Sequence, residues 1–255
     1  LFCICPISVF LAMEYYDQSA VYVPNPGHLW FLANIFLYVV LLLPLLSYLN
    51  YRPHNIVLRF LGKAFRHPAG LYLFALPIML EALLVQPKFF SLYVGTPHGF
   101  WLGLVCFLSG FLFVSAQESF WQAIERIRTV ALLLAFLLYL TRFLVFELKG
   151  PGVLTAFEST NWMLAILGYG STYLNKPSRF LAYASKAVYP VYIVHMPIQY
   201  FVSFYLLPLS LPVSVKLVML LSATFGGSLL LYELVIKRIK PIRPLFGMKL
   251  HATSI

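Results

Sequence analysis

Long apolar stretches alternate with short polar connections along the whole chain. Eight stretches follow one another, at 1–13, 29–49, 69–86, 98–117, 129–146, 154–174, 187–207 and 212–236. Within them apolar and polar residues do not alternate at every second position, which argues against strands. A helix needs about 20 apolar residues to cross a hydrocarbon core of about 30 Å. The pattern therefore predicts an all-α, polytopic transmembrane helical bundle with seven full spans, preceded by a partial helix over 1–13.

Composition supports a membrane protein. Hydrophobic residues make up 61% of the chain and charged residues only 10%, whereas a soluble domain is usually about 25% charged. Backbone amides in lipid must be satisfied within the protein, which leaves helices of the observed length. The lipid bilayer is therefore the expected surrounding, and a soluble domain is excluded.

Lys and Arg gather in every second connection between the apolar stretches. Fourteen of the 18 basic residues fall on one side, in the connections 50–68, 118–128 and 175–186 and in the tail after residue 236. The positive-inside rule places this side, and with it the C-terminus, in the cytoplasm of a cell whose inner membrane holds the protein. This topology accounts for the net charge of +10, so nucleic acid is not expected as a partner.

Two of the basic connections contain apolar residues at helical spacing. Residues 52–66 place Ile56, Phe60 and Phe65 among cations, and residues 118–128 have a similar pattern. Such segments are typical of amphipathic helices at the membrane surface.

Ionisable residues within spans are costly and therefore informative. Glu81, Arg142 and Glu158 lie near the outer ends of three predicted spans, and His28 and His98 at the outer starts of two others. A bundle would gather them into one polar cluster, in which Arg142 pairs with Glu81 or Glu158. The alternative is that Arg142 extends to the headgroups and that each remaining group is satisfied locally.

His195 is the single most informative residue. It lies near the predicted membrane midplane, with Tyr192 and Gln199 on the same helical face. Two flanking prolines, Pro190 and Pro197, weaken backbone hydrogen bonding there. Histidine takes up and releases a proton near neutral pH more readily than other side chains. A proton-transfer or substrate site and a purely structural hydrogen bond both remain open for His195.

Motifs of soluble enzymes are missing from the sequence. It contains no phosphate-binding glycine loop, no nucleophile elbow and no zinc-ligand pair. Cys3, Cys5 and Cys106 lack metal-ligand spacing and are interpreted as small buried apolar residues. We therefore expect no metal site and no bound cofactor.

Three stretches resemble the membrane-bound acyltransferase family 3. They are GHLWFLANIFLYVVLLLPLL (27–46), GFLFVSAQESFWQAIERIR (110–128) and LGYGSTYLNKPSRFLAYASKAVYPVYIVHMPIQY (167–200). Their order and spacing are similar to those of the family, and His195 falls on a recurring family histidine. The resemblance runs from about residue 20 to residue 240, and it is greatest for the branch that includes a periplasmic glucan succinyl-transfer protein.

The resemblance implies one membrane-embedded domain over 1–255, from a family whose members have about ten helices. By this count the chain lacks the N-terminal two to three helices. The best-known catalytic histidine of the family, and an Arg-rich motif, would lie in that part. We therefore expect the chain to be inactive without it.

The resemblance also implies the reaction. An integral membrane O-acyltransferase would move an acetyl- or succinyl-type group from cytoplasmic acyl-CoA to an outward-facing carbohydrate or glycolipid of the cell envelope. On this interpretation His195 is catalytic, and the substrate-binding residues are Tyr192, Glu81, Arg142, Glu158 and His28. The alternative is a carrier or flippase for a lipid-linked sugar or small metabolite, because midplane polar residues and proline-interrupted helices are equally typical of transporters. A non-catalytic membrane scaffold is a third interpretation.

Overall fold

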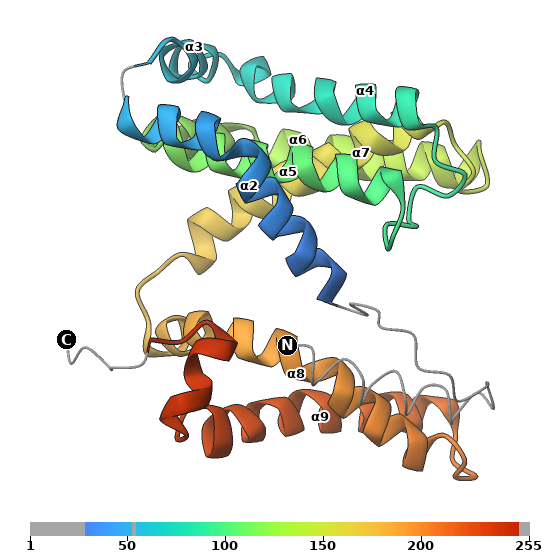
Figure 1. The fold of residues 1–255 in the computed structure, drawn as a ribbon. Helices are drawn as coiled ribbons and strands as arrows, with labels where there is room; N and C mark the ends of the chain where they lie inside the picture. The colour runs from blue at the N-terminus through green and yellow to red at the C-terminus, as the bar shows by residue number, and fades with distance from the viewer. Residues whose placement is uncertain (1–28, 53–54, 250–255) are drawn as a thin grey trace. The chain divides into compact units, whose positions relative to one another are not determined.

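The computed structural model describes residues 29–52 and 55–249, and every regular element in these ranges is a helix (Figure 1). The all-α prediction is confirmed. The predicted partial helix over 1–13 lies outside the described residues. The described residues form two compact units, 32–176 and 177–249, the second of which also includes 29–31. The single domain over 1–255 stays a prediction.

The unit 32–176 contains eight helical elements. They are α2 (Trp30–Tyr51), α3 (Ile56–Ala64), η2 (Pro68–Phe74), α4 (Ala75–Val85), α5 (Pro97–Ser115), α6 (Glu118–Leu144), α7 (Gly152–Tyr169) and η3 (Gly170–Leu174). The unit 177–249 contains α8 (Arg179–Leu206), α9 (Val213–Leu231), η4 (Tyr232–Ile236) and η5 (Lys240–Phe246).

Within the described residues, five helices are long and apolar enough to cross a membrane. They are Trp30–Tyr51, Pro68–Val85, Pro97–Ser115, Glu118–Leu144 and Val213–Ile236. Each corresponds to one predicted span, so a multi-pass helical bundle is supported. The other two predicted spans form α7 with η3 and α8, whose polar side chains make them less apolar. Their crossing of the membrane stays a prediction.

Side-chain caps fix where several helices begin. The Asn55 side-chain oxygen accepts a hydrogen bond from Leu58 N at 2.9 Å and starts α3. Thr96 Oγ1 caps α5 by accepting from Gly99 N at 3.0 Å. Ser178 caps α8, which therefore begins eight residues before the predicted apolar span. Such caps satisfy amides that have no partner within the helix.

Residues 118–128, one predicted amphipathic stretch, form the beginning of α6, whereas the other contains the separate short helix α3 at Ile56–Ala64. A helix of 27 residues is about 40 Å long, which exceeds a hydrocarbon core of about 30 Å. The first turns of α6 therefore extend beyond the core.

Aromatic rings join α3, η2 and α5 to the start of α6. Phe113 and Phe120 stack with ring centroids 4.2 Å apart, and Phe74 meets Phe113 edge-on at 4.3 Å. Phe65 packs edge-on against Phe120 at 5.9 Å. Each such pair contributes about 0.5–1.5 kcal/mol beyond burial, so this end of the unit is firmly packed.

Small residues allow α6 and α7 to lie close together. Ala131 and Ala135 on α6 are fully buried. A Cβ added to Gly168 of α7 would lie 2.6 Å from the Arg128 Cβ and 3.0 Å from the Ile124 carbonyl oxygen. Lipid tails give helices no hydrophobic reason to associate, so close backbone approach through small residues is an important source of attraction.

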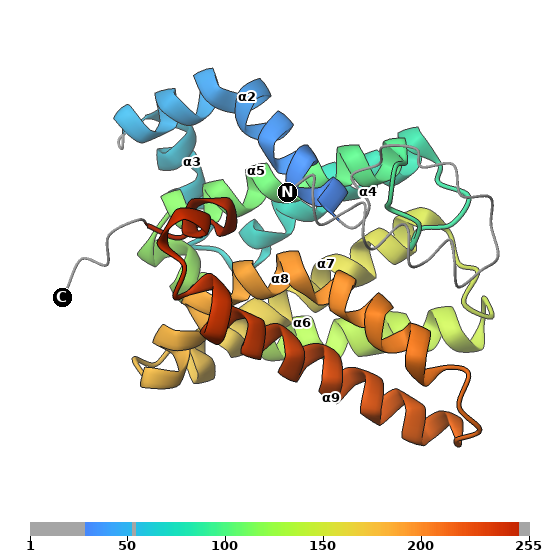
Figure 2. The same ribbon diagram turned by 60° about the horizontal axis from the view of Figure 1, so that its bottom comes forward.

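In the unit 177–249, α8 and α9 run side by side in both views (Figures 1 and 2). Gly227 of α9 lies against Ile198 of α8, where an added Cβ would approach to 3.2 Å. Gly247 ends η5 with φ of 67°, and a side chain there would strike the Tyr189 ring at 2.8 Å. Both glycines thus permit close contacts with α8.

Replacing Gly168 with Ala should destabilise the protein, because the new methyl forces α7 away from α6. We expect a loss of about 1–3 kcal/mol, typical of overpacking, measured as a lower unfolding midpoint in detergent. Gly170→Ala is the matched control, since nothing lies within 4 Å of its added Cβ and Ala suits a helix better than Gly. Equal midpoints for the two variants would contradict the close α6–α7 contact.

Candidate functional site

Four ionisable side chains lie at the end of the unit 32–176 where α4 and α6 finish and α5 and α7 begin (Figure 1). They are Glu81, His98, Arg142 and Glu158, and we call them the polar cluster. Glu81, His98 and Glu158 are buried. A charged group cannot be buried in an apolar surrounding without a partner, and the structure supplies one for each.

His98 is held through both ring nitrogens. Its Nδ1 lies 2.8 and 3.0 Å from the two carboxylate oxygens of Glu81, and its Nε2 lies 3.1 Å from the Phe90 carbonyl oxygen. A carbonyl oxygen only accepts hydrogen bonds, so Nε2 carries a hydrogen. The proton between Nδ1 and the carboxylate can sit on either partner, and in both cases the pair has no net charge.

This geometry makes His98 a link between α4 and α5. A histidine base needs one nitrogen free to take a proton from its substrate, and here the Phe90 carbonyl occupies Nε2. Tyr93 stacks on the ring at 5.5 Å between centroids. Burial raises the pKa of the Tyr93 hydroxyl, with smaller contributions from Cys106 and Glu81, so the phenol stays neutral beside the pair.

Arg142 pairs with Glu158, which decides between the two partners that the sequence left open. Its Nε donates to Oε2 at 2.6 Å and its Nη2 to Oε1 at 3.0 Å. The guanidinium also lies over the Tyr139 ring, 5.8 Å from its centroid. A two-point contact of this kind fixes orientation as well as distance. This contact is consistent with the prediction that Arg142 pairs with a carboxylate. Glu81, the other carboxylate that the sequence offered as its partner, pairs with His98.

A further buried polar contact, between Tyr72 and Asn161, was not predicted from the sequence. The Tyr72 hydroxyl donates to the Asn161 side-chain oxygen at 2.9 Å, and the Asn161 amide nitrogen donates to the Phe157 carbonyl at 2.9 Å. Asn161 is fully buried. A polar amide within an apolar stretch was the signal that could have revealed this link between η2 and α7.

A small apolar cavity lies between η2, α4, α5 and α7. Its volume is about 150 Å³, and its lining includes Phe74, Ile78, Cys106 and Leu164. Apolar cavities of about 150 Å³ stay dry and take ligands of the size of benzene. The cavity therefore has room for a short apolar group.

His195 lies in the middle third of α8, in the other unit. Its Nδ1 is 2.6 Å from the Tyr192 carbonyl oxygen, and the two rings lie 5.6 Å apart. The carbonyl accepts, so Nδ1 donates, and in the neutral ring Nε2 then carries the lone pair. Pro190 and Pro197 lie inside the same helix, as expected. His28, the remaining predicted site residue, lies outside the described residues.

Within the part of the chain that the structure describes, no group of three His, Cys, Asp or Glu side chains could hold a metal ion.

Replacing Glu158 with Gln should destabilise the protein strongly, because Arg142 is left without its counter-charge in an apolar surrounding. Removing one partner of a buried pair costs about 3–5 kcal/mol, whereas removing both is often much less costly. We expect the double variant Arg142→Gln/Glu158→Gln to unfold at a higher midpoint than Glu158→Gln alone. Glu233→Gln breaks the more exposed pair with Lys237 and serves as a control, with an effect below about 1 kcal/mol. A double variant less stable than either single variant would contradict this interpretation.

Comparison with known proteins identifies the family. A model of the acyltransferase 3 family, described as an acyltransferase domain, matches residues 1–233. No curated protein and no solved structure matches the chain. The match covers most of the chain and includes α8 with His195 and the helices of the polar cluster. The chain therefore belongs to the membrane-bound acyltransferase family 3.

Proposed function

We propose that the protein transfers a short acyl group, of acetyl or succinyl type, from cytoplasmic acyl-CoA to a hydroxyl group of an outward-facing carbohydrate or glycolipid. The observation that carries the proposal is the family match over residues 1–233. The resemblance to the glucan succinyl-transfer branch favours a cell-envelope glucan as acceptor. The uneven distribution of Lys and Arg supports an inner-membrane protein with a cytoplasmic C-terminus.

The reaction sets clear requirements. The acceptor oxygen attacks the thioester carbonyl carbon, the carbon–sulfur bond breaks, and the thiolate leaves. A base takes the hydroxyl proton and can pass it to the departing sulfur. The negative charge that develops on the carbonyl oxygen needs hydrogen-bond donors.

His195 is our candidate for the base. Its Nδ1 donates to the Tyr192 carbonyl oxygen at 2.6 Å, and histidine is the side chain that most often serves as a general base. Its backbone partner is one turn away on α8, so the ring orientation is set by the helix itself. Tyr192 accompanies the ring and is our candidate for contact with the substrate.

The polar cluster is our candidate for the acceptor side. Carbohydrates present hydroxyl groups that match carboxylate and guanidinium groups. Glu81 and Glu158 already bind His98 and Arg142, so they hold these two side chains in place beside an acceptor. His28 is assigned to the same side by its place in the sequence. The small apolar cavity favours a short acyl group over a long chain.

Replacing His195 with Gln should reduce acyl transfer by about 10²–10⁴-fold, the range that general bases contribute. Transfer of a radiolabelled acyl group to the acceptor, by the full-length protein in membranes, measures the effect. His67→Asn is the control, because His67 only caps η2 through Ala69 N and should leave activity within twofold. A His195→Gln enzyme that retained half of the wild-type activity would remove His195 from the site.

Donor use separates transfer from transport. A carrier is as compatible as an enzyme with the prolines inside α8 and with the π-helical turns η3 and η4. We expect one molecule of acyl-CoA to be consumed for each acylated acceptor formed, measured as free thiol against labelled product. Movement of unmodified acceptor across vesicles without thiol release would instead establish a carrier.

A further inference from the structure

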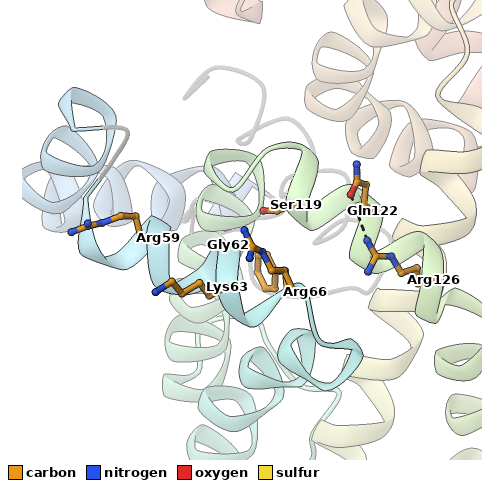
Figure 3. A pocket seen from close by; sticks show the side chains of 8 residues that line it. Arg59, Gly62, Lys63, Arg66, Ser119, Gln122 and Arg126 are labelled. Atoms are coloured by element: carbon orange, nitrogen blue, oxygen red, sulfur yellow. Dashed lines mark hydrogen bonds between the residues drawn. The ribbon is translucent and has the colours of Figure 1, made fainter.

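A cleft of about 430 Å³ lies between α3 and the first turns of α6 (Figure 3). Its lining includes Arg59, Lys63, Arg66 and Arg126, together with the polar side chains of Ser119 and Gln122. We call it the basic cleft, because four cations and no carboxylate line it. Its volume is within the range of sites that bind small molecules.

The spacing of residues on two helices creates this cleft. Arg59, Lys63 and Arg66 follow one another at four and three residues, which places them on one side of α3 and its C-terminal turn. Ser119, Gln122 and Arg126 are spaced by three and four residues on α6. Two polar faces from different helices therefore line the same space.

The floor of the basic cleft is rigid. Phe65 lines it, is only 1% exposed, and packs against Phe120 of α6. Leu61 is buried in the same apolar core. The exposed side chains of Ile56 and Phe60 lie three residues before Arg59 and Lys63, so the apolar side of α3 adjoins its cations, and it suits contact with lipid. The buried side of the helix is thus held against α6, while the charged ends of Arg59 and Lys63 point away from α6 (Figure 3).

None of the four cleft cations has an anionic partner among residues 29–52 and 55–249. Arg59, Lys63 and Arg66 form no ion pair there, and Arg126 contacts only the neutral Gln122, at 3.5 Å. Like charges repel one another, so an arrangement that gathers four of them is stabilised by a bound anion.

Nearby Arg128 shows the contrasting, structural use of a cation. Its Nη1 donates to Thr172 Oγ1 at 2.7 Å, and its guanidinium lies 5.6 Å from the ring centroids of both Tyr169 and Tyr173. This arginine is satisfied by the protein itself, whereas the cleft cations are available to a ligand.

We propose that the basic cleft binds phosphate ester groups, specifically those of the nucleotide portion of the acyl donor. Arg and Lys are the side chains that bind phosphate most strongly, Arg often through two hydrogen bonds. The proposal rests on the proposed function for its choice of a nucleotide-bearing donor. The headgroups of anionic lipids share the same chemistry and are the competing source of phosphate.

Gly62 permits a sharp test of this site. It lines the basic cleft, and nothing lies within 4 Å of a Cβ added there, so a side chain can begin at this position without a clash. Gly62→Glu and Gly62→Gln introduce nearly the same volume but differ by one negative charge. Binding of radiolabelled coenzyme A to the purified full-length protein in phosphatidylcholine nanodiscs should be at least about tenfold weaker for Gly62→Glu than for Gly62→Gln.

Removal of positive charge gives an independent measurement. Lys63→Gln/Arg66→Gln should raise the dissociation constant of coenzyme A and the KM for acyl-CoA about tenfold, with kcat at saturating donor within twofold. Arg238→Gln/Lys240→Gln removes the same charge from another exposed basic stretch and should bind as the wild type does. Equal affinities for all four variants and the wild type would overturn the proposal.

The lipid source is tested in nanodiscs that contain phosphatidylglycerol, by mass spectrometry of the retained lipid. If Lys63→Gln/Arg66→Gln loses phosphatidylglycerol but binds coenzyme A normally, the cleft is a lipid site and the assignment to the donor is wrong. If the wild type transfers acyl groups and the cleft variants bind coenzyme A as the wild type does, the proposed function stands without this site. If the wild type binds no coenzyme A, the proposed donor and the cleft assignment both fail.

Discussion

The hydrogen-bonding demand of a backbone in lipid governs this structure. An amide group in hydrocarbon has no water to bind, so each spanning segment must form its bonds within itself, as a helix. The same demand applies to side chains. Glu81, Arg142 and Glu158 each lie beside a partner from a neighbouring helix, and Asn161 binds both Tyr72 and its own helix. Polar links thereby tie together helices that apolar burial alone would not hold.

Packing inside the unit 32–176 differs along its length. Small residues let α6 and α7 approach closely around Gly168, whereas aromatic rings fill the region between α3, α5 and α6. Close approach draws on dispersion forces, which need many atoms in contact. The rings secure the short amphipathic helix α3, which is too short to be stable without such packing.

The two ends of this unit differ in electrostatic character. Near one end of α6, Arg126 lines the basic cleft. Near the other end, Arg142 is neutralised by Glu158. Sixteen residues of helix separate these arginines, a distance of about 24 Å that approaches the thickness of the hydrocarbon core. This difference accompanies the proposed placement of the acyl donor at the basic cleft and of the acceptor at the polar cluster.

The sequence by itself determined the helical class, the positions of five apolar helices long enough to span a membrane, and the family, because length and apolarity along the chain are local properties. It also identified Glu81, Arg142 and Glu158 as costly side chains in need of partners. Only the tertiary structure decided that Glu158 rather than Glu81 pairs with Arg142, and that both nitrogens of His98 are engaged. It alone brought Arg59 and Arg126 to one cleft, although 67 residues separate them in the chain. Partner choice depends on how helices pack, and that packing is set by many weak contacts between residues distant in sequence, which no local pattern encodes.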